Sequence, residues 1–183
     1  RLPAYYKMYI QRQLDEYKNC IRYLAGVRNF LYYVEDENGN VVGGKALIKN
    51  ANYNTVNIAN SNIHRKLDDS NVIISGIVYG GYSEDGKTNG NKVFINNSNI
   101  EEMVFGGFSY QNTAAENFVK IDNSKIESNV YGASSLQNAD FNKVVINNST
   151  VIGNVYGAYT INGNTSNNAV TIKNSSIYSP VYG

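Results

Sequence analysis

Residues 142–159 read NKVVINNSTVIGNVYGAY, and this pattern recurs along most of the chain. Its second half, a Val-aromatic-Gly triplet usually followed by a small residue, occurs five times, with valines 26, 26, 25 and 26 residues apart. A repeat of this length indicates a chain that revisits one supersecondary unit instead of building a conventional globular core. The triplets are Val78-Tyr79-Gly80, Val104-Phe105-Gly106, Val130-Tyr131-Gly132, Val155-Tyr156-Gly157 and Val181-Tyr182-Gly183.

A second motif, N-x-V-x-I-x-N-S, accompanies the first at a similar interval. Inside it, Val and Ile alternate with mostly polar residues, which is typical of a strand with one buried face. Two positions after the motif comes a further apolar residue: Ile63, Ile100, Ile126, Val151 or Ile177. The copies span residues 54–61, 91–98, 117–124, 142–149 and 168–175.

These short strands, with no helical pattern between them, predict a mainly β fold: a parallel β-helix, or β-solenoid, of about 25–26 residues per coil. Val41-Val42-Gly43-Gly44 is a degenerate first copy of the triplet. The Val and Ile columns are expected to fill the interior. The glycine after each aromatic residue is expected to allow a bend with positive φ or a close backbone approach. An amide ladder at a corner is expected for Asn60, Asn97, Asn123, Asn148 and Asn174.

One coil is longer than the others. About 11 extra residues fall within His64 to Ser75, a stretch that carries charged residues and then the apolar run Val72, Ile73 and Ile74. Insertions in solenoids map to loops on one face and are often functional. A charged, solvated loop without a further role explains the same stretch.

The N-terminal segment differs from the repeats. Residues 1–28 carry six Lys or Arg against Asp15 and Glu16, and their apolar residues fall at helical spacing. This predicts an amphipathic helix in 1–28 that caps the solenoid of 29–183, with Phe30 to Val34 as a strand in a degenerate opening coil. A partner-binding or membrane-surface helix, or a segment foreign to the solenoid, fits the pattern too. Because the chain ends at Gly183 inside a repeat, we expect the coils to continue beyond it.

Composition argues against several functions. A net charge of +1 with 17% charged residues does not suit a nucleic-acid binder. Cys20 is the one cysteine and His64 the one histidine, so neither a metal site nor a Cys or Ser nucleophile with a His base is indicated. We expect no catalytic residues, no metal and no cofactor. Carbohydrate-cleaving β-helices use clustered acids, whereas the acidic residues here are scattered along the sequence.

The aromatic positions are the best candidates for a binding surface. If the valine of each triplet points inward, its aromatic neighbour points outward and forms a stripe that could bind a glycan or a protein. Alternatively, the rings stack on one another and stabilise the solenoid. The predicted aromatic stripe consists of Tyr79, Phe105, Tyr131, Tyr156 and Tyr182 in one column, and Tyr82, Phe108 and Tyr159 in a second.

The repeat unit at 142–159 resembles the repeats in passenger domains of Gram-negative type V autotransporters, and the likeness covers about 41–183. This resemblance implies a right-handed parallel β-helix that is secreted and displayed at the cell surface, anchored in the outer membrane by a C-terminal β-barrel outside this sequence. The barrel is then the only link to a membrane. The near absence of cysteine agrees with such export, since disulfides can obstruct translocation.

The resemblance favours an adhesin-like structural role: the repeats bind host or neighbouring-cell surfaces through a surface protein or glycan. Two alternatives remain open: a polysaccharide-processing enzyme on the same scaffold and a toxin-type passenger. Two or three acidic residues clustered with a basic residue on one outer face would favour the enzyme.

Overall fold

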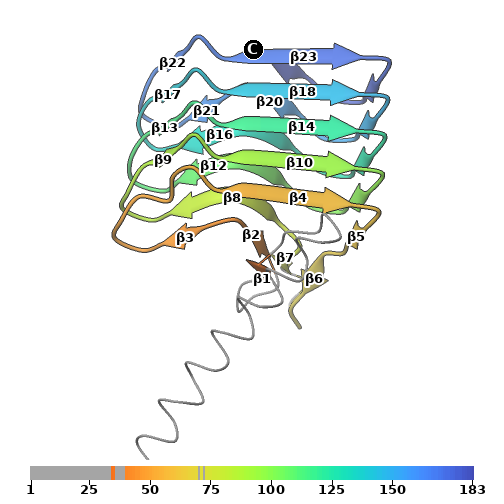
Figure 1. Cartoon of the computed structure of the whole chain (residues 1–183), viewed down its shortest axis with the longest axis horizontal. Helices are drawn as coiled ribbons and strands as arrows, with labels where there is room; N and C mark the ends of the chain where they lie inside the picture. The colour runs from red at the N-terminus through yellow and green to blue at the C-terminus, as the bar shows by residue number, and fades with distance from the viewer. Residues whose placement is uncertain (1–33, 36–39, 70, 72) are drawn as a thin grey trace, which may run out of the picture.

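The computed structural model describes residues 34–35, 40–69, 71 and 73–183. In this part of the chain all regular structure is β, and successive coils stack into a β-solenoid (Figure 1). The prediction of a parallel β-helix is therefore confirmed. The predicted helix in 1–28 and residues 30–33 of the opening strand lie outside the described residues.

The coils form four parallel sheets in which neighbouring strands come from successive coils. The first sheet holds β2 (Val41–Val42), β8 (Val78–Ser83), β12 (Val104–Ser109), β16 (Val130–Ser135), β20 (Val155–Tyr156) and β25 (Val181–Tyr182). In the same sheet, β3 (Lys45–Ala46) pairs with β8 and β21 (Tyr159–Thr160) pairs with β16, whereas β1 (Val34–Glu35) pairs antiparallel with β2. The second holds β4 (Thr55–Ala59), β10 (Lys92–Asn96), β14 (Phe118–Asp122), β18 (Lys143–Asn147) and β23 (Ala169–Lys173).

The third and fourth sheets consist of two-residue strands. The third holds β5 (Asn62–Ile63), β11 (Asn99–Ile100), β15 (Lys125–Ile126), β19 (Thr150–Val151) and β24 (Ser176–Ile177). The fourth holds β9 (Thr88–Asn89), β13 (Ala114–Ala115), β17 (Ala139–Asp140) and β22 (Thr165–Ser166).

Register between coils follows the sequence repeat. Val93 pairs with Val56 on one side and with Val119 on the other, and the neighbouring isoleucines pair in the same way. Identical side chains therefore stack into columns about 4.8 Å apart. The Val and Ile columns form one continuous apolar core in which most members are fully buried, as the alternating pattern predicts. Burial of each such side chain stabilises the fold by about 1.5–3 kcal/mol.

Two corners flank every strand of the second sheet, and both use left-handed backbone. Asn60, Asn97, Asn123, Asn148 and Asn174 form the later corner, with φ between 48° and 52°. Asn tolerates this conformation better than most residues, which explains why it recurs there. The predicted amide ladder does not run along this column, because its side chains are exposed. Among the described residues, their one side-chain hydrogen bond runs from Asn123 Nδ2 to Asn96 Oδ1, at 3.4 Å.

The amide ladder runs instead through the first Asn of the motif. Asn91 donates from both its backbone N–H and its Nδ2 to Oδ1 of Asn117, each at 3.0 Å, and Asn117 repeats this toward Asn142. All three are buried. The motif's Ser forms a second ladder, in which the backbone N–H of Ser98 donates to Ser124 Oγ at 3.0 Å. These ladders satisfy polar groups that would otherwise be costly to bury.

The insertion forms a short antiparallel hairpin of β6 (Lys66–Leu67) and β7 (Ile73–Ser75). It projects beside the first coil and leaves the stacking of β4 on β10 intact (Figure 1). Its residues 66–69 are exposed, in agreement with a solvated element. What the sequence does not show is the antiparallel pairing.

Candidate functional site

The structure brings all eight residues of the aromatic stripe onto the first sheet. The first column is continuous, because Tyr79, Phe105, Tyr131, Tyr156 and Tyr182 follow one another in register. Successive ring centroids are 4.7–5.2 Å apart, with interplanar angles of 4–9°. The rings therefore stack face to face along the solenoid axis.

The second column is interrupted. Tyr82 stacks on Phe108 at 5.5 Å, but the next position in register is Ser134, and a ring returns only at Tyr159. Edge contacts join the two columns: Tyr79 meets Tyr82 at 5.3 Å and an interplanar angle of 75°. The stripe is thus an aromatic cluster of two columns joined by edge contacts, in which Ser134 takes the place of a ring in the second column.

Stacking covers most of the ring faces, so that mainly the ring edges are exposed to solvent. Phe105 is 5% exposed, whereas Tyr159 and Tyr182 are 45% and 48% exposed. Each stacked pair contributes about 0.5–1.5 kcal/mol beyond its buried area, so the stripe stabilises the fold. A partner that packs on ring faces has access mainly at Tyr159 and Tyr182. Most rings of the stripe therefore stabilise the fold by stacking, whereas Tyr159 and Tyr182 remain accessible to a partner.

The structure also assembles a charged cluster where the hairpin meets the solenoid. His64 Nδ1 lies 2.7 Å from Glu101 Oε1, and the backbone N–H of Arg65 donates to Glu101 Oε2 at 3.0 Å. The Arg65 guanidinium reaches Glu102 Oε1 at 3.7 Å and Glu127 Oε2 at 3.9 Å. Lys125 completes the cluster with a 2.6 Å contact to Glu127.

The environments of two neighbouring carboxyls push their pKa values in opposite directions. The hydrogen bond from His64, with that from the Arg65 backbone, lowers the pKa of Glu101 below its ordinary value. Burial raises the pKa of Glu102, whose side chain is 4% exposed, despite the nearby Arg65 charge. Two carboxyls whose pKa values are shifted apart are typical of acid–base pairs, although structural ion pairs shift pKa values in the same way.

Sequence reasoning treated these acids as scattered, and for Glu101, Glu102 and Glu127 the structure corrects this. The signal was in the repeat itself. Glu101 and Glu127 each follow the apolar residue of the third sheet by one position, as His64 does. Counting positions within the coil therefore places His64, Glu101 and Glu127 in one column.

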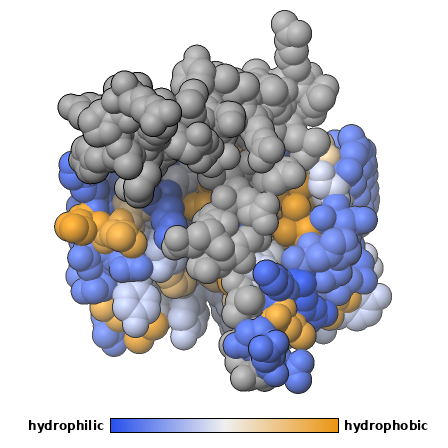
Figure 2. All heavy atoms as spheres, turned by 90° about the horizontal axis from the view of Figure 1, so that it is seen from below, coloured by the Kyte–Doolittle hydropathy of each residue, from blue (hydrophilic) through white to orange (hydrophobic). Residues whose placement is uncertain are grey.

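Among the described residues, no group of three His, Cys, Asp or Glu side chains is arranged to hold a metal ion. In the same residues there is no helix of the length and apolarity needed to cross a membrane. Viewed from the first-coil end, the visible flanks are mostly hydrophilic, with apolar residues in small separate patches (Figure 2).

No known protein family, curated protein or solved structure matches this chain.

Proposed function

We propose that this chain is a structural and adhesive solenoid, a rigid arm that binds surfaces of host or neighbouring cells through a surface protein or glycan. The observation that carries the proposal is the unbroken register from coil to coil. It presents similar side chains at every coil, and such linear arrays suit extended or multivalent partners. The ladders inside the corners keep these arrays rigid.

The likeness of the repeat to type V autotransporter passengers supports the same function. On that likeness, the chain is an adhesin-like passenger region displayed outside the cell and anchored to the outer membrane. The solenoid fold is compatible with this role, because stacked repeats create extended binding surfaces.

Binding of protein-coated beads to cultured epithelial cells and to bacterial cells tests the adhesive function. Beads carrying the wild-type chain are expected to bind saturably and above beads carrying an unrelated protein; equal binding would refute the proposal. Tyr159→Ser removes the most accessible ring face of the second column. Tyr178→Ser, a 71% exposed tyrosine outside the stripe, is the matched control. A selective loss with Tyr159→Ser would assign contact to the stripe, and equal binding by both variants would exclude that ring.

A polysaccharide-processing enzyme is the second candidate, favoured by the convergence of Glu101, Glu102 and Glu127 on Arg65. In this alternative Glu102 is the proton donor and Glu101 the ionised carboxylate. Because Glu102 is buried, a substrate can reach its carboxyl only after a local rearrangement. Release of reducing ends from a panel of polysaccharides, abolished by Glu102→Gln and retained by Glu84→Gln in an exposed loop, would establish it.

A further inference from the structure

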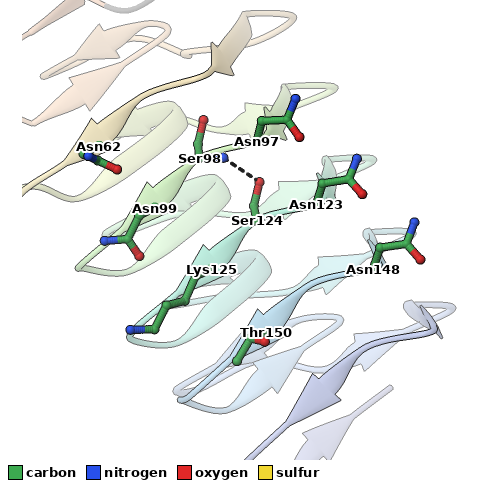
Figure 3. A pocket seen from close by; sticks show the side chains of 9 residues that line it. All are labelled: Asn62, Asn97, Ser98, Asn99, Asn123, Ser124, Lys125, Asn148 and Thr150. Atoms are coloured by element: carbon green, nitrogen blue, oxygen red, sulfur yellow. Dashed lines mark hydrogen bonds between the residues drawn. The ribbon is translucent and has the colours of Figure 1, made fainter.

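A shallow polar groove of about 460 Å³ lies along the corner between the second and third sheets (Figure 3). It is separate from the aromatic stripe and shares only Lys125 with the charged cluster. Asn97, Asn123 and Asn148 form one wall, each in the left-handed conformation. Asn62, Asn99, Lys125 and Thr150, at successive coils of the third sheet, form the other. Ser98 and Ser124 lie between the walls.

The floor of the groove has its polar groups satisfied by the protein, and the walls do not. Ser98 Oγ donates to the Asn96 carbonyl at 2.8 Å, and Ser98 N–H donates to Ser124 Oγ. By contrast, Asn99 Oδ1 has no hydrogen-bond partner among the described residues. The side chains of Asn97 and Asn148 make no hydrogen bond within the described part of the chain.

Unused hydrogen-bonding groups are common on a surface, but here they recur from coil to coil along both sides of one groove. A ligand with hydroxyl or amide groups can reach the exposed, unbonded amides of Asn97 and Asn148. The buried Asn ladder of the neighbouring corner, with its side-chain groups bonded from coil to coil, lacks this free capacity.

The lining determines the chemical class of the ligand. No apolar side chain lines the groove, which excludes a hydrophobic ligand, and no carboxylate lines it, which disfavours a cation. Its single charge, Lys125, is neutralised by Glu127 at 2.6 Å, which disfavours an anion. We propose that this amide groove binds a neutral, linear, β-linked polysaccharide. The proposal rests on the adhesive function above and specifies its ligand.

Spacing gives the orientation. The wall residues repeat at each coil, about 4.8 Å apart. In an extended β-1,4-linked glycan, each sugar advances by slightly more than this distance. Such a chain laid parallel to the solenoid axis meets one amide of the Asn97, Asn123 and Asn148 wall at each coil. Several weak contacts on one chain then add, and longer oligosaccharides bind more tightly.

Isothermal titration with cellohexaose and chitohexaose tests the proposal, with maltohexaose, an α-linked curved chain, as the geometric control. At least one extended hexamer is expected to bind, and at least tenfold more tightly than the corresponding dimer. The variant Asn97→Gly/Asn148→Gly removes two wall amides while retaining residues that tolerate positive φ. It is expected to lose at least tenfold in affinity.

The matched control is Asn60→Gly/Asn174→Gly, because these residues occupy the same corner column and lie outside the groove. It should bind as the wild type does. Absence of binding by both extended hexamers, equal binding of maltohexaose, or equal loss in the two variants would overturn the proposal. Beads that bind cells equally with wild-type and Asn97→Gly/Asn148→Gly protein would refute the groove as the contact site and leave the adhesive function intact. Wild-type beads that bind no cells would refute the adhesive function itself.

Discussion

Gly106 shows how closely the backbones of successive coils approach at the first sheet. A Cβ at this position would collide with the carbonyl oxygen of Gly132 in the next coil, and Gly80 and Gly132 are in the same situation. None of these glycines has positive φ. Of the two roles expected for this glycine, close backbone approach is therefore confirmed and the left-handed bend is not.

Gly106→Ala is expected to destabilise the solenoid by about 1–3 kcal/mol, since the methyl group must force two coils apart. Urea unfolding followed by circular dichroism measures the change. Gly157→Ala is the control in the same column, because its Cβ would meet Asn168 Cβ at 3.1 Å, a contact that small shifts can relieve. Equal losses for the two variants would contradict the steric explanation.

Glu101 and Glu102 give opposite contributions to the pH dependence of stability. Because its folded-state pKa is lowered, Glu101 stabilises the fold above its unfolded-state pKa of about 4.3, and this contribution is lost as pH falls through the folded-state value. The folded-state pKa of Glu102 is raised, so its contribution is present at low pH and is lost as pH rises through that value.

Thermal melts between pH 3 and 7 are expected to separate the two residues. Glu101→Gln should reduce the fall in melting temperature that the wild type shows toward acid pH. Glu102→Gln should raise the melting temperature relative to the wild type more at pH 7 than at pH 3. Asp122 is a reference for the behaviour expected of Glu101, because its pKa is also lowered: hydrogen bonds from Lys120 and Asn147 outweigh the effect of its burial. Parallel pH profiles for the two Gln variants would refute these assignments.

At the scale of the element, most of the architecture followed from spacing. The strands of the second sheet, their buried Val and Ile, and the register between coils were predictable, because a repeat imposes the same environment on equivalent residues. The choice between the two Asn columns was not. Both recur in every copy, and only backbone geometry distinguishes a left-handed corner from a buried ladder. The charged cluster was missed because its members lie far apart in sequence.

The gap at Ser134 predicts a stabilising substitution. Ser134→Tyr places a ring between Phe108 and Tyr159 in register, creating two new stacked pairs worth about 1–3 kcal/mol in total. A higher midpoint of urea unfolding is expected. Thr171→Tyr, at an exposed position of β23, controls for the general preference of tyrosine for strands. No gain over that control would show that Ser134 does not mark a free ring position.

At the scale of the whole molecule, each coil contacts only its neighbours, so stability should vary along the axis. Val119 in the central coils is fully buried, whereas Ile172 and Val181 in the last described coil are 37% and 43% exposed. Hydrogen exchange followed by mass spectrometry is therefore expected to be slowest in β12 and β14 and fastest in β23 and β25. Uniform protection would indicate that the coils unfold as one cooperative unit.

The equal register of successive coils has a consequence for how such a chain can change in evolution. Removing residues 104–129 would join Met103 to Val130, which already stacks beside Val104 with the same neighbours inside and outside. Loss or duplication of a coil by recombination between similar gene segments thus alters the length of the molecule in steps of about 4.8 Å and requires no new sequence. The length of the solenoid can therefore change in evolution without a change in the side chains that its surface presents.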